Sequence, residues 1–315
     1  MTPDPAIHLN DLSLPELFRV LVAGSTLERL LELARDEDLG DRGDVTSACV
    51  IDPGRHAVAH VSSRAAGVVA GIAAVPSVVD VFAGSGFDRV HVDVHVADGA
   101  RVAAGARLAT LEGSLLSILA MERTLLNLVG RASGIATTTA TYADAVLGTA
   151  AVVCDTRKTT PGLRMLEKYA VRCGGGTMHR VGLDDAVLLK DNHLAGIPES
   201  QLGETLREAI ERARAGGPLR FVEVEVDTLE QLDAVLGLGR LVDIVLLDNM
   251  TDEELREAVR RRGERNEHVK LEASGGVDLD RVLAVARTGV DRIAIGALTH
   301  GATSLDVGLD VEPTA

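Results

Sequence analysis

The chain has 315 residues, a formal net charge of −15 at pH 7 and an isoelectric point near 5.0. Only 2% of its residues are aromatic and 46% are hydrophobic, so small aliphatic side chains must fill the core. Proteins that bind nucleic acid need a basic surface and aromatic rings that stack on bases, and this composition excludes that class.

The first half of the chain predicts a small α+β domain. Residues 55–113 alternate apolar and polar side chains between glycine turns, as in VHVDVHVADGARVAAGARLATLEG, and a period of two is typical of β-hairpins. A helical stretch follows at 114–147 and leads into the second half. We expect this helix to be broken, because it contains Gly130 and Gly134 and glycine disfavours helix interiors.

Three polar residues on that stretch share one helical face. Arg123, Asn127 and Arg131 are spaced four residues apart, which places them in one row along a helix. Polar rows of this kind usually face water, so from the pattern alone we interpret the row as a solvated stripe.

The second half alternates short apolar segments with helical patterns. Strands are predicted at 151–156, 186–191, 221–226, 243–248, 269–274 and 292–298. Helices are predicted at 199–215, 228–237, 251–262 and 279–288. This alternation predicts a parallel sheet with right-handed crossovers. Because no strand leads into a G-x-G-x-x-G turn and a full eight-stranded barrel needs about 250 residues, we favour a barrel with fewer strands.

Polar residues lie at the carboxyl ends of the predicted strands, where barrels bind ligands, and the third strand carries two of them on one face. Strand by strand they are Thr156 with Arg157 and Lys158, Lys190 to His193, Glu223 with Glu225, Asp248 with Asn249, Ser274 to Gly276, and Gly296. Each group alone is common in a solvated loop or at a helix cap. A barrel rim would instead gather all of them into one bowl.

The predicted bowl contains groups for both anions and hydroxyls. Gly275 and Gly276 directly precede a helix, so their main-chain N–H groups can approach a phosphate closely. The cations Arg157, Lys158, Arg180 and Lys190 indicate further anionic groups, such as carboxylates or a diphosphate. Glu225 and Asp248 are suited to sugar hydroxyls or to Mg²⁺.

The sequence also indicates where the protein works. Cys49, Cys154 and Cys173 are an odd set without disulfide or zinc spacing, which is typical of a reducing compartment. No basic leader precedes an apolar run near the N-terminus, and no apolar segment reaches transmembrane length. We therefore expect a cytoplasmic protein that does not bind a membrane.

Seven segments, in order and with ordinary spacing, resemble the quinolinate phosphoribosyltransferases. They are ERTLLNLVGRASGIAT, DTRKTTPGLR, GGGTMHRVGLDDAVLLKDNH, EVEVDTLEQL, LLDN, LEASGG and IAIGALTH. They span roughly residues 120–300, and EDLGDRGDVTS at 37–47 resembles the start of the family. The resemblance implies an α/β fold with an N-terminal sandwich domain at 1–130, against which a tail at 299–315 packs. It also implies an incomplete α/β barrel of six or seven strands at 131–298.

The activity implied by the resemblance is transfer of phosphoribose from phosphoribosyl pyrophosphate (PRPP) to quinolinate. The acceptor loses its 2-carboxylate, so the products are nicotinate mononucleotide, pyrophosphate and CO2, in the synthesis of NAD. The resemblance further implies Mg²⁺ as cofactor. It implies a homodimer, or a larger oligomer, in which the partner subunit completes each active site.

The resemblance also assigns roles to residues of the bowl. The predicted substrate-binding residues are Arg123, Thr156, Arg157, Lys158, His179, Arg180, Lys190, Glu225, Asp248, Ser274, Gly275, Gly276, Ile295, Gly296 and Ala297. The resemblance implies that the quinolinate carboxylates are bound by Arg157, His179, Arg180 and Lys190, together with Arg123 of the partner subunit. By the same resemblance, Lys158 would lie near the pyrophosphate, and the residues from Ser274 onward would bind the 5-phosphate. The predicted catalytic residues are Lys158, Lys190, Glu225 and Asp248, the last two also being the predicted metal ligands.

One departure from the family and three alternatives remain open at this point. Met178 stands where the family usually has Asn before His179, so we expect an orienting amide hydrogen bond to be missing. A related family linked to molybdate transport shares much of the pattern but usually lacks the KDNH segment that begins at Lys190. A Schiff-base aldolase using Lys190 is a chemical rival. A non-catalytic protein that binds quinolinate is another.

Overall fold

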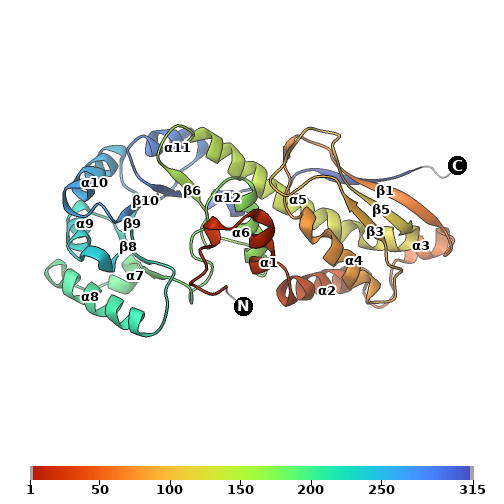
Figure 1. Cartoon of the computed structure of the whole chain (residues 1–315), viewed down its shortest axis with the longest axis horizontal. Coiled ribbons are helices and arrows are strands. Elements are labelled where there is room, and N and C mark those ends of the chain that lie inside the picture. The colour runs from red at the N-terminus through yellow and green to blue at the C-terminus, as the bar shows by residue number, and fades with distance from the viewer. Residues whose placement is uncertain (1–2, 313–315) are drawn as a thin grey trace.

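The structure is a computed structural model that describes residues 3–312. It is elongated, with an antiparallel sheet and its helices at one end and a barrel of parallel strands at the other (Figure 1). Among residues 3–312, no helix combines the length and the apolar character that crossing a lipid bilayer requires. The helices, with 3-10 turns written η, are η1 (Leu9–Asp11), α1 (Leu14–Leu21), α2 (Ser25–Leu39), α3 (Val45–Val50), η2 (Ile72–Ala74), α4 (Val75–Ala83), α5 (Leu115–Ala145), α6 (Arg164–Cys173), α7 (Asp191–Leu194), α8 (Glu199–Ala215), α9 (Leu229–Leu236), η3 (Gly239–Leu241), α10 (Asp252–Arg265), α11 (Leu279–Ala286) and α12 (Ala297–His300).

The N-terminal sheet has antiparallel strands in the order β12-β1-β5-β3. Their bounds are β1 (His56–Ser63), β3 (His91–Val94), β5 (Arg107–Ser114) and β12 (Val307–Val311), while β2 (Gly67–Val68) pairs separately with β4 (Arg101–Val102). The end of the chain thus returns to this sheet, with Val311 opposite Ala59. Of the predicted tail at 299–315, residues 313–315 lie outside the described residues, as do residues 1–2 of the predicted first domain.

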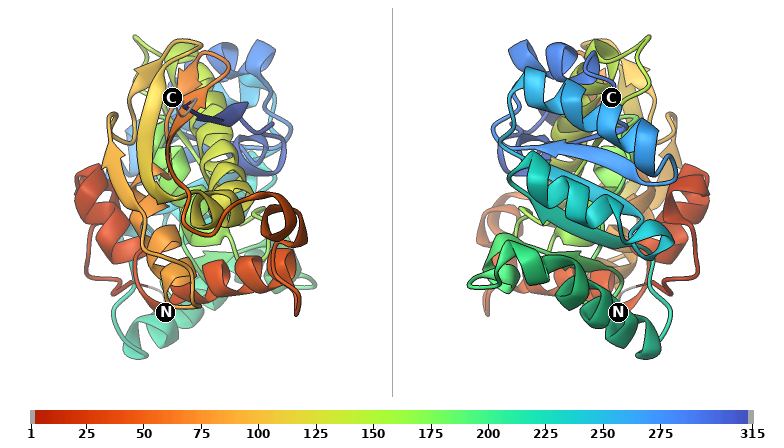
Figure 2. Two further views of the ribbon diagram at one scale, coloured as in Figure 1. Left: turned by 90° about the vertical axis from the view of Figure 1, so that its right-hand side faces the viewer. Right: turned by 90° about the vertical axis from the view of Figure 1, so that its left-hand side faces the viewer.

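The barrel contains six parallel strands in the order β6-β11-β10-β9-β8-β7. They are β6 (Val152–Cys154), β7 (Val187–Leu189), β8 (Val222–Val226), β9 (Ile244–Asp248), β10 (Lys270–Ser274) and β11 (Arg292–Ala294). Helices α8, α9, α10 and α11 cover its outer side (Figures 1 and 2). β6 and β7 form the two edges of the sheet, so the barrel is incomplete, and the predicted fold class is confirmed.

The last predicted strand, 292–298, is too long. β11 ends at Ala294, and residues from Ala297 form the short helix α12, where the N–H groups of Thr299 and His300 donate to the carbonyl of Gly296. The apolar run IAIGAL does not distinguish a strand from a buried helical turn, because neither period is complete over so few residues.

The predicted break at Gly130 and Gly134 is wrong, because α5 runs without interruption from Leu115 to Ala145. These glycines instead let the chain after α12 cross the helix closely. A Cβ atom on Gly134 would lie 2.0 Å from the carbonyl oxygen of Thr303. The N–H of Leu305 donates to the carbonyl of Gly130 at 2.9 Å. Because these two positions lack a side chain, residues 303–305 can pack directly against the main chain of α5.

Arg131 does not belong to a solvated stripe. Its guanidinium forms an ion pair with the buried Glu167 at 2.8 Å. It also donates to the carbonyl oxygens of Thr299 and Ala302, both at 2.7 Å. Arg131 therefore ties α5 to α6 and to the end of α12. The helical spacing was read correctly, but the interpretation as a water-facing row is wrong for this residue.

Residues before the N-terminal sheet lie against the barrel. Helix α1 packs on α6 (Figure 1), and the rings of Phe18 and Tyr169 meet edge to face with centroids 5.3 Å apart. Leu9 and Leu17 are buried in the same region. The chain therefore reaches the barrel twice, first with its opening residues and again after α5.

Candidate active site

One cavity of about 920 Å³ opens at the carboxyl ends of the barrel strands. The barrel rim gathers the polar strand ends there, as expected for this architecture. Of the predicted substrate-binding residues, the cavity is lined by Thr156, Arg157, Lys158, His179, Arg180, Lys190, Glu225, Asp248, Ser274, Gly275, Gly276, Ile295, Gly296 and Ala297. Arg123 alone is not among its lining residues.

Two guanidinium groups lie close together in this cavity. Burial, and then the neighbouring charge of Arg157, lowers the pKa of Arg180. The Nε atom of Arg157 is buried and has no hydrogen-bond partner among residues 3–312. Because a buried donor without a partner is costly, this wall of the cavity is suited to an anionic ligand.

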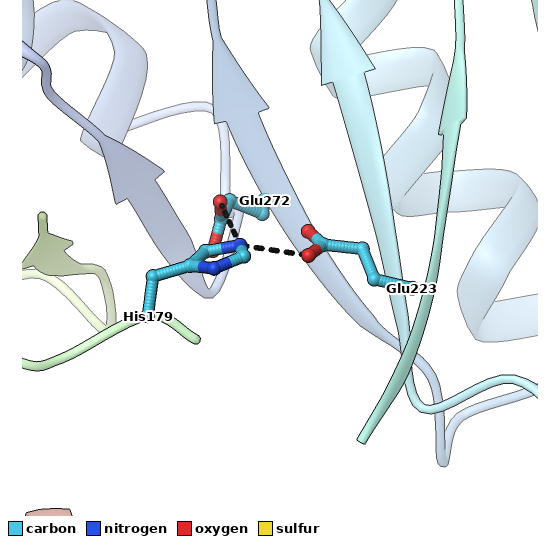
Figure 3. Close-up of side chains that lie close together, drawn as sticks. All are labelled: His179, Glu223 and Glu272. Carbon is cyan, nitrogen blue, oxygen red and sulfur yellow. Dashed lines mark ion pairs between the residues drawn. The ribbon is translucent and has the colours of Figure 1, made fainter. Parts of the chain in front are cut away.

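His179, which lines the cavity, lies against two buried glutamates, Glu223 and Glu272 (Figure 3). Its Nε2 atom lies 2.7 Å from Oε2 of Glu223 on β8 and 3.4 Å from Oε1 of Glu272 on β10. Arg292 donates to the other oxygen of Glu272 at 2.6 Å. Two cationic groups therefore face two carboxylates.

The charges in this cluster act on one another in both directions: burial and the neighbouring Glu272 raise the pKa of Glu223, although His179 opposes this. Burial opposes the charged imidazole, but Glu223 and Glu272 raise the pKa of His179 to about 10. Burial likewise opposes the carboxylate of Glu272, but His179 and Arg292 lower its pKa to about 2. The main-chain nitrogen of Arg180 lies 2.7 Å from Nδ1 of His179, and Nε2 is the ring nitrogen that faces the two carboxylates.

The donor atoms of His179, Glu223 and Glu272 lie within 4.8 Å of one another, close enough to hold a metal ion. We interpret the group as an ion-pair network, because His179 and Arg292 already balance both carboxylates. A metal ligand would instead need His179 to give up its Nε2 proton.

Two further carboxylates, those of Glu225 and Asp248, line the cavity. Glu225 is almost fully buried and forms an ion pair with Nζ of Lys190. Asp248 ends β9, and its Oδ2 atom accepts a hydrogen bond from the side chain of Asn249 at 2.6 Å. Carboxylate oxygens are the ligands that Mg²⁺ prefers, usually one or two together with substrate phosphates and water. The side chains of Glu225 and Asp248 therefore fit a magnesium ion that is held jointly with substrate.

The glycine turn after β10 has two different glycines. Gly275 has φ +102°, and a Cβ atom there would lie 2.2 Å from Oδ1 of Asn249. Gly276 has φ +57°, and a Cβ atom there would meet no described atom within 4 Å. Gly275 is thus required by packing against Asn249, whereas the space at Gly276 is open to a ligand.

Gly296 brings two basic side chains into the cavity wall. A Cβ atom on Gly296 would lie 3.0 Å from Cδ of Lys158 and 3.0 Å from Nε2 of His300. The hydroxyl of Thr299 donates to the carbonyl of Lys158 at 2.8 Å, which fixes the main chain there. The glycine at this strand end therefore permits a close approach of Lys158 to α12.

Arg123 lies in a separate groove. This groove, of about 460 Å³, runs between α2, α5 and α6, and the side chain of Arg123 is 63% exposed. Glu122 approaches it at 3.8 Å. Within one chain, Arg123 therefore does not reach the cavity.

Sequence reasoning missed several residues of the cavity. The polar and charged ones among them are Tyr142, Glu272, Asp278 and His300. Glu272 had a usable signal, because it precedes Ser274 by two residues and so shares its face of β10. Tyr142 on α5 and His300 on α12 had none, since only long-range packing brings those helices to the rim.

Both domains match known family profiles. A profile described as quinolinate phosphoribosyl transferase, C-terminal domain, matches residues 135–310, and the corresponding N-terminal profile matches residues 44–133. A nicotinate-nucleotide pyrophosphorylase [carboxylating] from Mycobacterium leprae is 44% identical over 92% of this chain and 97% of its own length. A mitochondrial quinolinate phosphoribosyltransferase [decarboxylating] from Nicotiana glauca is 35% identical over 91% of this chain and 82% of its own.

Solved structures agree with these sequence matches. The nicotinate-nucleotide pyrophosphorylase of Francisella tularensis superimposes with a TM-score of 0.80 at 31% identity, covering 97% of this chain and 99% of that one. The corresponding protein of Ehrlichia chaffeensis has a TM-score of 0.79 at 34% identity, covering 92% and 100%.

Proposed function

This chain belongs to the quinolinate phosphoribosyltransferase family, and we infer from that membership that it transfers the phosphoribosyl group of PRPP to quinolinate. The enzyme is decarboxylating, and its products are nicotinate mononucleotide, pyrophosphate and CO2 in the synthesis of NAD. The observation that carries this function is the cavity itself. It combines a cationic wall, two carboxylates and an open glycine turn at one barrel rim.

The cationic wall is the proposed site of quinolinate. Its two adjacent carboxylates would be held by Arg157, His179, Arg180 and Lys190, with Thr156 beside them. The buried, unpartnered Nε atom of Arg157, beside the guanidinium of Arg180, supports this placement. Planar guanidinium groups recognise carboxylates through paired hydrogen bonds, which also fixes the orientation of the pyridine ring.

The glycine turn is the proposed site of the PRPP 5-phosphate. Open space at Gly276 supports this, and Ser274, Gly275, Ile295, Gly296 and Ala297 complete the same part of the wall. Lys158 would face the pyrophosphate. Glu225 and Asp248 would contact the ribose hydroxyls and hold Mg²⁺. Magnesium bound with the diphosphate would act as a Lewis acid that neutralises negative charge on the leaving group.

The mechanism follows from where these charges lie. As the C1–O bond to pyrophosphate breaks, positive charge develops on the ribose, and Glu225 and Asp248 stabilise it electrostatically. Lys158 stabilises the departing oxygens. The quinolinate nitrogen forms the new bond and becomes cationic. The C2–carboxylate bond then breaks with its electron pair left at C2, beside that cation, and a proton takes the place of CO2. No protein nucleophile is needed, so orientation supplies much of the rate.

We also propose that the enzyme is a cytoplasmic homodimer, or a larger oligomer, with shared active sites. Arg123 is exposed in its own chain and lies outside its own cavity. In a two-fold dimer each chain lends the same residue to its partner, so Arg123 would reach the quinolinate of the other subunit.

A Schiff-base aldolase is not favoured. The Nζ atom of Lys190 is held in an ion pair with Glu225, whereas a Schiff-base lysine needs a free amine. The molybdate-linked alternative is not favoured by the family profiles or the relatives either.

CO2 release from carboxyl-labelled quinolinate, in the presence of PRPP and Mg²⁺, tests the proposed function. Nicotinate should be a poor acceptor, because each cation left unpaired in the cavity costs about 1–3 kcal/mol, or roughly 5- to 150-fold. Lys190→Ala should be nearly inactive. Lys270→Ala should retain activity, because Lys270 begins β10 and the cavity lies at the other end of that strand, at Ser274. Comparable turnover of nicotinate and quinolinate would contradict the assignment.

A further inference from the structure

The first residues of the chain contact the segment that carries two proposed quinolinate ligands. We call residues 3–12 the N-terminal arm and residues 177–182 the substrate loop. On the arm, Nδ2 of Asn10 donates to the carbonyl of Met178 at 3.0 Å, and the N–H of Met178 donates to Oδ1 of Asn10 at 2.8 Å. One side chain thus satisfies both main-chain groups of the residue directly before His179 and Arg180.

The arm also reaches the other end of the substrate loop. The buried carboxylate of Asp185 accepts hydrogen bonds from the N–H groups of Val181 at 2.9 Å and Gly182 at 3.0 Å. Arg220 donates to the same carboxylate at 3.2 Å, and its guanidinium also donates to the carbonyl of Ile7 on the arm. The loop is therefore held before and after His179 and Arg180.

A second arginine joins the arm to the chain just before the loop. Arg172 donates from one nitrogen to the carbonyl of Asn10 at 3.0 Å and from another to the carbonyl of Gly176 at 3.1 Å. Leu9 is 3% exposed and packs in the core, which anchors the arm itself. The polar contacts of the arm with the barrel thus centre on the substrate loop and its two ends.

We propose that the N-terminal arm positions the substrate loop for quinolinate, and that Asn10 is a positioning residue for His179 and Arg180. This rests on the proposed function. Met178 offers no side-chain amide, as the sequence predicts. The amide of Asn10, near the start of the chain, binds the main chain of Met178. Each hydrogen bond removes freedom from the loop before substrate arrives, which lowers the ordering cost of binding.

The test compares Asn10→Leu, which keeps the branched shape and the number of heavy atoms but removes both hydrogen bonds, with His8→Ala, an exposed position on the same arm. Asn10→Leu should raise the KM for quinolinate about tenfold and leave the KM for PRPP within about twofold. Amide hydrogen exchange of residues 177–182 should become about tenfold faster. Asn10→Asp keeps the acceptor for the Met178 N–H, so it should recover part of both effects. His8→Ala should behave like the wild type.

Three outcomes would overturn the proposal. The first is unchanged exchange of residues 177–182 in Asn10→Leu, which shows that Asn10 does not hold the loop. The second is a parallel rise of both KM values together with a lower melting temperature, which shows a merely structural role. The third is a wild-type enzyme that releases no CO2 from quinolinate. That result removes the proposed function as well, and the exchange measurement then reports separately whether the arm orders the loop.

Discussion

Replacing Gly276 by alanine separates phosphate recognition from folding. Its φ of +57° lies in the left-handed region, and the new Cβ atom would enter space that no described atom occupies within 4 Å. At Gly275 the new atom would instead lie 2.2 Å from the side chain of Asn249, which hydrogen-bonds Asp248. A substitution there would disturb the fold and a proposed catalytic residue together, so Gly276 is the cleaner position.

The structure sets the expected size of each effect. A non-glycine residue in the left-handed region costs about 1–2 kcal/mol, which lowers the melting temperature of a chain of this size by roughly 1.5–3 °C. Loss of one hydrogen bond to a charged phosphate costs about 1.5–3 kcal/mol, or roughly 10- to 150-fold in affinity. Gly276→Ala should therefore be folded, slightly less stable, and much weaker for PRPP.

The assay measures the KM for PRPP and for quinolinate by CO2 release, alongside thermal unfolding. Gly239→Ala is the matched control, because Gly239 has φ +65° and equally open surroundings but does not line the cavity. It should lose similar stability and keep both KM values. If Gly276→Ala had the same PRPP KM as Gly239→Ala, or raised both KM values equally, the glycine turn would not be the phosphate site.

Three further predictions concern other parts of the molecule. Arg123→Ala and Lys190→Ala should each be nearly inactive but dimeric, and activity should reappear when the two are mixed under conditions of proven subunit exchange; a mixture that stays inactive would refute sharing across the interface. Glu223 and Glu272 raise the pKa of His179 to about 10. The contribution of the charged His179 ring to the free energy of unfolding should therefore be complete below about pH 6.5 and fall as the pH rises toward 10. Unfolding measurements should show this loss in the wild type but not in His179→Gln, and an NMR titration midpoint near 6.5 would contradict it. Gly134→Ala should destabilise the fold by several kcal/mol in denaturant unfolding, since its Cβ atom would lie 2.0 Å from the main chain of Thr303, and a neutral effect would show that the crossing can relax.

Local patterns were sufficient for the barrel and most of its rim. The strands of the second half recur within a few residues of their predicted bounds, because buried parallel strands are short apolar runs between helices. Once the strands are placed, the rule that ligands bind at their carboxyl ends brings Arg157, Lys190 and Asp248 together without any knowledge of side-chain contacts.

Contacts between distant segments could not be read in the same way. The glycines of α5 leave room for residues 303–305 to cross the helix, and a local pattern shows only that glycine weakens a helix. Asn10 is separated by 168 residues from the main chain that it binds. Nothing within a short window links such pairs, so Tyr142 and His300 were missed for the same reason.

The uninterrupted course of α5 has a mechanical consequence. Tyr142, near one end of the helix, lines the cavity of its own chain, while Arg123 lies 19 residues earlier, about 28 Å along the axis at 1.5 Å per residue. In the proposed dimer, helix α5 would contact the substrate of its own subunit through Tyr142 and the substrate of the partner subunit through Arg123. An axial shift of that helix cannot alter one catalytic centre alone. Turnover in one subunit and readiness in the other would be linked through the stiffness of a single helix.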